Sequence, residues 1–204
     1  KGRLSDVLVY ASLPWVLRLF VRAESGLSGA KQTQLLATAV LFTAVVFAFV
    51  PTFLALVVWV AITWIIGGLI ARVSMRQALA VGRVVVALMV GALVLNAPWV
   101  SQFANSQWMD HFVGSQAASV QQVGLTHLAR FDGGILRFGI IALGLYIPVF
   151  VSVVVTRSTT FIWATRSLSL VVFTGLLIVL IDSDVLNIAA PSFGQLLAIV
   201  ACGL

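Results

Sequence analysis

The chain has 204 residues, of which 61% are hydrophobic and only 9% are charged, and its mean hydropathy is +1.14. Soluble domains carry about 25% charged residues, so a soluble protein with an unusually large core is the disfavoured alternative. The formal net charge of +6 does not indicate a nucleic-acid partner, because Lys and Arg lie between apolar segments and not in one run. The composition predicts an all-α, polytopic transmembrane helix bundle surrounded by membrane lipids.

The N-terminal segment 4–22 has a short apolar part, which contains Pro14 and is flanked by arginines. We expect an interfacial helix here, with Trp15 and Arg18 at headgroup depth, and a full crossing is the open alternative. The chain begins without methionine or a signal peptide and ends within the apolar run 196–204. We therefore expect a single membrane domain, 1–204, that belongs to a longer polypeptide.

Apolar runs of the length that crosses a membrane, about 20 residues, follow along the chain. Five complete runs and a truncated sixth lie at 33–50, 52–71, 84–101, 136–156, 161–181 and 194–204. Pro51 separates the first two and predicts a tight hairpin, because proline cannot continue the helical hydrogen-bond ladder. Pro148 predicts a kink within the fourth run.

Basic residues accumulate on one side of this path. With residues 1–31 in the cytoplasm, the inner side receives ten Lys and Arg residues and the outer side only Arg130 and Arg137. This asymmetry predicts an integral plasma-membrane protein with the polar loop 102–135 outside the cell. The inner residues are Lys1, Arg3, Arg18, Arg22, Lys31, Arg72, Arg76, Arg83, Arg157 and Arg166.

The outer loop holds the one cluster of titratable residues with a catalytic interpretation, Asp110, His111, His127 and Asp132. A carboxylate and an imidazole in one cavity can exchange a proton with an acceptor hydroxyl or hold a divalent ion. No HExxH or DxD spacing supports this role, and an ordinary polar loop is the favoured reading. No metal site and no cofactor motif are predicted.

The inner arginines Arg72, Arg76, Arg83, Arg157 and Arg166 are candidates for binding the phosphate of a lipid-linked donor or an anionic headgroup. Membrane topology alone also explains them. Arg166 is the strongest candidate, because it lies inside the expected membrane boundary, where an unpaired cation is costly. The alternative is that its side chain extends to the interface.

Two further patterns concern aromatic and small residues. Trp99, Phe103 and Trp108 offer a platform for a sugar ring or a polyprenyl chain, although an aromatic belt at the outer interface is the favoured interpretation. The pairs Gly67 with Ala71 and Ala87 with Gly91 have the small-xxx-small spacing that lets two helices approach closely.

Four stretches in chain order carry a resemblance to a known family. They are RLSDVLVYASLPWVLRLFVR at 3–22, LLATAVLFTAVVFAFVPTFLALVVW at 35–59, LVLNAPWVSQF at 93–103 and IWATRSLSLVVFTGLLIVL at 162–180. Together they resemble the membrane portion of large actinobacterial family-2-type glycosyltransferases, in which a cytoplasmic sugar-transfer domain precedes a multi-helix region.

The resemblance implies a role in assembling cell-envelope glycans, with a polyprenyl-phosphate-linked sugar as donor or acceptor. The sugar-transfer motif would lie elsewhere in the polypeptide, and no catalytic residue carries over to this chain. The leading hypothesis is thus a membrane domain that anchors the enzyme and binds a lipid-linked substrate. A transporter or flippase component and a purely structural anchor are the alternatives.

Overall fold

A computed structural model describes residues 3–26, 30–103, 159–182 and 191–203, together with the single positions Ile147 and Val151. Every element in the described part is an α-helix, which confirms the all-α class. The helices are α1 (Arg3–Glu24), α2 (Ala30–Phe49), α3 (Phe53–Ile70), α4 (Met75–Leu95), α5 (Ala97–Phe103), α9 (Thr159–Asp182) and α10 (Phe193–Gly203). Of these, α1, α3, α4 and α9 are long and apolar enough to cross a membrane, whereas α2 and α10 have shorter apolar parts.

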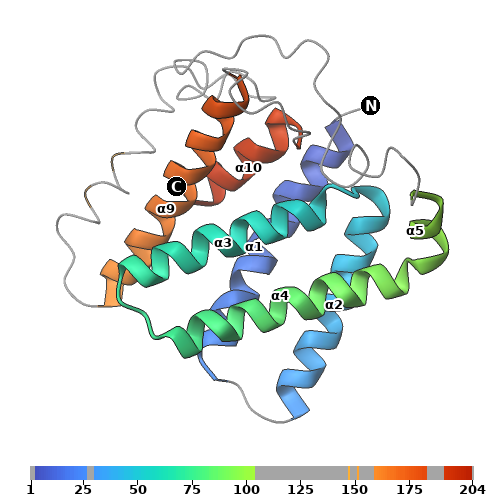
Figure 1. Cartoon of the computed structure of the whole chain (residues 1–204), viewed down its shortest axis with the longest axis horizontal. Helices are drawn as coiled ribbons and strands as arrows, with labels where there is room; N and C mark the ends of the chain where they lie inside the picture. Colours follow the sequence, from blue (N-terminus) through green and yellow to red (C-terminus); the bar gives the residue numbers. More distant parts are fainter. Residues whose placement is uncertain are drawn as a thin grey trace.

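The helices form a bundle in which α3 and α4 lie side by side in front of α1 (Figure 1). α9 packs against the other side of α3, α10 lies between α1 and α9, and α2 packs along α4. Apolar side chains from α1, α2, α3, α4, α9 and α10 make one shared core, with Phe20 and Phe53 among its largest fully buried members. The bundle therefore buries one face of each long helix.

α1 follows the length of this bundle. Its 22 residues span about 33 Å at a rise of about 1.5 Å per residue, enough to cross a hydrocarbon layer of about 30 Å. Near its first turn Asp6 accepts a hydrogen bond from Ser192, and at its last turn Glu24 contacts α3 and α9. By length and composition α1 is therefore able to cross a membrane, which is the alternative left open for segment 4–22.

The chain turns sharply between α2 and α3, as predicted at Pro51, although α2 then packs mainly along α4 and not against α3. α2 ends at Phe49 and α3 begins at Phe53. The Val50 amide donates to the carbonyl of Val46, and the Val50 carbonyl accepts from the Phe53 amide, so the chain reverses within a few residues.

The run predicted at 84–101 differs from the helix that forms. α4 begins at Met75, after the extended Ser74, and ends at Leu95. The helix starts before the predicted run because arginine is a good helix former, so the arginines of this segment extend the helix without ending it. The earlier end reflects Pro98, which cannot donate within a helix and would clash with the preceding turn. Asn96 instead starts the short helix α5 by accepting from the Trp99 and Val100 amides.

Two glycines allow the helices to approach closely, as the small-residue spacing predicted. A Cβ built on Gly67 would lie 2.7 Å from the Ser169 hydroxyl and 2.9 Å from the Arg166 Cα, so α3 and α9 almost touch there. A Cβ on Gly91 would collide with a methyl group of Val40, which fixes the contact between α4 and α2.

A capping box forms at the start of α10, and its two polar side chains also bond to α1 and to the residue before α3. The Gln195 amide donates to the Ser192 hydroxyl at 3.4 Å, and the Gln195 side chain accepts from the Ser192 amide at 3.3 Å and from Thr52 at 3.0 Å. The Asp6 carboxylate lies against Gly194, where it complements the positive end of the helix dipole.

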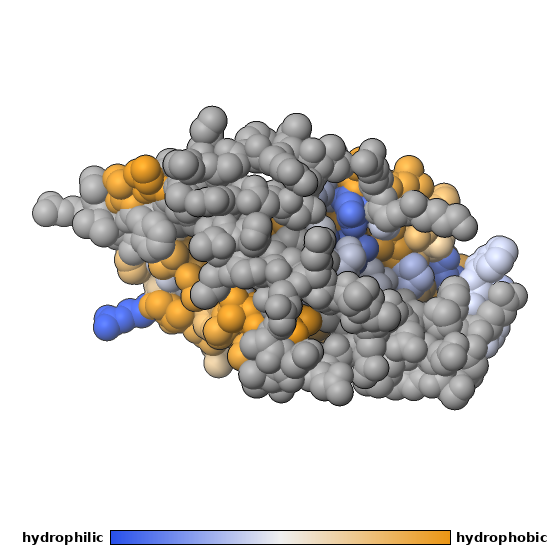
Figure 2. Space-filling view, turned by 90° about the horizontal axis from the view of Figure 1, so that it is seen from above, coloured by the Kyte–Doolittle hydropathy of each residue, from blue (hydrophilic) through white to orange (hydrophobic). Residues whose placement is uncertain are grey.

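The outward faces of the helices carry large apolar side chains at every fourth residue. On α4 these are Val86, Val90 and Val94, which are 59%, 55% and 65% exposed. α2 repeats the pattern with an apolar stripe formed by Leu41, Val45 and Phe49. In Figure 2, most of the described residues that reach the visible surface are hydrophobic.

The predicted crossing at 136–156, with its kink at Pro148, lies outside the described residues apart from Ile147 and Val151. Both of these positions are helical and exposed. The expected outer loop 102–135 lies outside them as well, except that residues 102 and 103 belong to α5.

Candidate lipid-binding groove

Arg166, the strongest candidate from the sequence, lies in the first half of α9 and is only 3% exposed. Its Nη1 donates to Glu24 Oε2 at 2.7 Å, and its Nη2 donates to Glu24 Oε1 at 2.8 Å. Two parallel, charge-assisted bonds of this kind make a strong and directional ion pair. Arg166 therefore does not extend to a surface, and both of its terminal nitrogens are engaged with Glu24.

Aromatic rings and a glycine enclose the pair. Trp64 of α3 donates its indole N–H to Glu24 Oε1 at 3.2 Å, and the guanidinium carbon lies 4.7 Å from the Trp64 ring centroid and 5.9 Å from that of Trp163. A Cβ on Gly68 would come within 3.2 Å of Nη2, so glycine leaves room for the guanidinium.

The void beside this pair, as lined by the described residues, is very small. Among the described residues the Arg166 Nε has no hydrogen-bond partner, and the adjoining void has no room for a water molecule. A phosphate would reach Arg166 only by displacing Glu24. The cluster instead joins the end of α1 to α3 and to the start of α9.

A larger cavity lies between α1 and α2, with α4 as its floor. It has a volume of about 440 Å³, which is within the range of roughly 300–1,000 Å³ that is usual for small-molecule sites. Its lining residues are Trp15, Val16, Arg18, Leu19, Arg22, Leu35, Thr38, Ala39, Phe42, Thr43 and Leu88. We call it the α1/α2 groove.

The α1/α2 groove arises from the helical spacing of its residues. On α1 its lining residues recur three and four positions apart, and those of α2 do the same, so each helix turns one stripe toward the other. Ala39 is small and leaves space at the centre of the α2 stripe. The Thr38 hydroxyl donates to the Gln34 carbonyl at 2.9 Å, so it is satisfied within its own helix.

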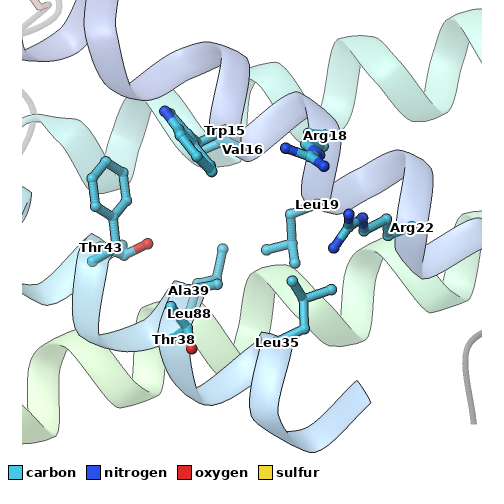
Figure 3. Close-up of a pocket in the computed structure, with 11 residues that line it drawn as sticks. Trp15, Val16, Arg18, Leu19, Arg22, Leu35, Thr38, Ala39, Thr43 and Leu88 are labelled. Atoms are coloured by element: carbon cyan, nitrogen blue, oxygen red, sulfur yellow. The ribbon is translucent and has the colours of Figure 1, made fainter. Parts of the chain in front are cut away.

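The two ends of the groove differ in chemistry. Figure 3 shows the guanidinium of Arg22 directed toward Leu19 and Leu35, with Arg18 on the same side. At the other end the Trp15 and Phe42 rings lie 6.5 Å apart, centroid to centroid. The cavity is therefore apolar over most of its length and cationic at one end.

Neither arginine of the groove has a carboxylate partner within the described part of the chain. Asp6 accepts from Ser192 at the opposite end of α1, and Glu24 is paired with Arg166. The Arg18 guanidinium carbon lies 5.9 Å from the Trp15 ring centroid, a weak cation–π contact. Two cations on successive turns of one helix repel each other, so an anion bound between them would lower the electrostatic energy at this end of the groove.

The other residues singled out from the sequence do not converge on this cavity. Arg72, Arg76 and Arg83 are exposed and lie outside the groove. Trp99 is exposed on α5. Five candidates lie outside the described residues: Asp110, His111, His127, Asp132 and Arg157. Trp108 does so too, and of Phe103 the structure describes only its place in α5. Among the described residues, no group of His, Cys, Asp or Glu could hold a metal ion.

Sequence reasoning placed Arg18 at headgroup depth but did not assign it or Arg22 to a site. The signal that could have found them is their four-residue spacing on α1, opposite a second apolar stripe on α2. Comparisons of the chain with family models, with curated proteins and with solved structures find no match.

Proposed function

We propose that the chain is the membrane domain of a cell-envelope glycosyltransferase, which anchors the enzyme and holds a lipid-linked donor or acceptor at its lateral surface. The α1/α2 groove is the observation that carries the proposal. It is an apolar cavity on the flank of a bundle with apolar outer faces, and it ends in two cations that have no carboxylate partner among the described residues. The glycosyl-transfer part rests on the family resemblance alone.

Embedding of the bundle in lipid is supported by its outer surface. The exposed stripe of Val86, Val90 and Val94 on α4 would form a large apolar patch in water, a feature that soluble monomers rarely show. In a bilayer the same side chains face hydrocarbon. The proposed bundle has five complete crossings and a truncated sixth that contains α10, and α1 adds a further crossing.

The orientation follows from the charges at the two ends of the bundle. The ends of α1 and α3 meet the starts of α4 and α9 around Glu24 and Arg166. This end also carries Arg22, Lys31 and Arg72, whereas Asp6 lies at the opposite end. By the preference of basic residues for the cytoplasm, we place the basic end there. A crossing α1 then puts residues 1–3 outside, unlike the sequence-based placement of residues 1–31.

The test uses membranes that contain the full-length protein and measures incorporation of radiolabelled sugar into the lipid extract. Ala39→Trp fills the centre of the groove and should reduce this incorporation at least tenfold. Ala37→Trp is the matched control, because Ala37 is exposed on α2 and does not line the groove. Unchanged incorporation in Ala39→Trp, with the protein folded and embedded, would contradict a substrate role for the groove.

Transport of a lipid-linked or hydrophobic substrate is the second candidate. It requires a polar path through the bundle, and the buried hydroxyls of α3 and α9 do not indicate one. Thr63 donates to carbonyls of its own helix, and Thr174 accepts from the Trp59 indole at 3.1 Å. Movement of a fluorescent lipid across proteoliposomes, without sugar incorporation, would favour transport over transfer.

A further inference from the structure

We infer that the α1/α2 groove binds a single-chain lipid phosphate, with its hydrocarbon chain against Leu19, Leu35 and Ala39 and its phosphate between Arg18 and Arg22. The inference rests on the proposed membrane embedding and names the chemical class of the lipid. It assigns the phosphate-binding role to two residues of α1 and not to Arg166, whose terminal nitrogens are held by Glu24.

Charge complementarity identifies the headgroup. Arg18 and Arg22 together carry two positive charges, and Asp6 and Glu24 are engaged elsewhere. A phosphate monoester carries about −1.5 to −2 charges at neutral pH and offers three acceptor oxygens, which matches two guanidinium groups. A phosphodiester carries a single charge, and a zwitterionic headgroup has no net charge. The monoester is therefore the best match, which assigns the groove to a lipid-phosphate acceptor and not to a lipid-linked sugar, whose phosphate is a diester.

The location of the two arginines fits the depth of a lipid headgroup. Arg22 lies within the last turn of α1, and Arg18 one turn deeper. Trp15 is seven residues before Arg22, so the groove reaches about 10 Å along the helix from its cationic end. A chain lying in it would run parallel to α1 and into the hydrocarbon layer, with its phosphate at the basic end of the bundle.

The shape of the groove favours one chain over two. Its walls are single stripes of α1 and α2, and Leu88 of α4 closes the floor. Phe42 and Trp15 narrow the far end. Both helices also expose apolar residues outside the groove, such as Val7 of α1 and Leu41 of α2, against which the remainder of a longer chain can lie in the bilayer.

The experiment measures equilibrium binding of radiolabelled hexadecyl phosphate to the full-length protein in nanodiscs of phosphatidylcholine. We expect saturable binding that weakens at least tenfold in Arg18→Gln/Arg22→Gln, since the double variant removes both charged donors to the phosphate. Arg76→Gln removes an exposed cation of α4 outside the groove and should leave binding unchanged. Hexadecanol, which has the chain without the phosphate, should not compete.

Three results would overturn the inference. One is equal binding by the double arginine variant, and another is effective competition by hexadecanol. The third is competition by dioleoyl phosphatidic acid at least as strong as that by unlabelled hexadecyl phosphate, which would assign the groove to two-chain phospholipids. Resistance of each variant to carbonate extraction from membranes is measured in parallel, so that a loss of embedding, which would refute the proposed function, is distinguished from a loss of lipid binding.

Discussion

Removing the charge of Glu24 should destabilise the bundle strongly, because it leaves Arg166 buried without a counter-ion. Arg166 is 3% exposed, and its ion pair is the contact that joins the end of α1 to α9. Loss of one partner of a buried pair costs about 3–5 kcal/mol. Since 11% of the Glu24 side chain is accessible to solvent, we expect Glu24→Gln to reduce the free energy of unfolding by an amount at the lower end of this range, about 3 kcal/mol.

A double-mutant cycle separates this pair from its surroundings. Arg166→Met should also destabilise, because it leaves the Glu24 carboxylate with only the Trp64 indole as a described partner. The double variant Glu24→Gln/Arg166→Met should cost at least about 1.5 kcal/mol less than the sum of the single variants, since no buried charge remains unpaired. Arg76→Met, at an exposed cation, is the control and should change stability by no more than about 0.5 kcal/mol.

The assay is unfolding in mixed micelles by titration with sodium dodecyl sulfate, followed by circular dichroism at 222 nm. The free energy of unfolding of the four proteins in the cycle gives the coupling between Glu24 and Arg166 directly. If Glu24→Gln loses less than about 1 kcal/mol of unfolding free energy, as is typical of a surface pair, the Glu24–Arg166 pair does not act as a buried ion pair.

Two further predictions concern helix packing and capping, and the same unfolding assay measures both. Gly91→Ala should destabilise by about 1–3 kcal/mol, because its new methyl group would collide with Val40. Gly82→Ala on the same helix has open space around its Cβ and should stabilise by about 0.5–1 kcal/mol, and equal effects of the two substitutions would contradict the close contact of α2 with α4. Ser192→Ala should destabilise by about 0.5–2 kcal/mol and speed amide exchange in the first turn of α10, because it removes the hydroxyl that caps the Gln195 amide. Unaltered exchange there would show that the capping box does not hold the start of α10.

Local patterns in the sequence predicted much of the fold. The absence of charge over long runs indicated membrane helices, Pro51 located the α2/α3 turn, and the spacing of Gly67 and Gly91 located two close helix contacts. Each of these depends on residues within one helix or one turn. The ends of α4 are harder to predict, because Arg83 interrupts the apolar pattern although it lies inside the helix.

The candidate site depends on contacts between distant segments and is harder to predict from the sequence. Glu24 and Arg166 are separated by 142 positions in the sequence, and only their expected location on the same side of the membrane is compatible with an ion pair between them. The α1/α2 groove needs the register between two antiparallel helices, which places Arg22 near Leu35 and Trp15 near Phe42. No periodicity within α1 alone specifies that register.

The most direct measurement of the central claim is the environment of the apolar stripe on α4. A nitroxide is attached at Val90→Cys in a Cys202→Ala background, and the protein is reconstituted in phosphatidylcholine vesicles. We predict that its relaxation is enhanced far more by oxygen, which concentrates in hydrocarbon, than by a water-soluble nickel complex, with the reverse at Arg76→Cys. Greater access of the nickel complex at position 90 would show that water, and not lipid, covers this face of the bundle.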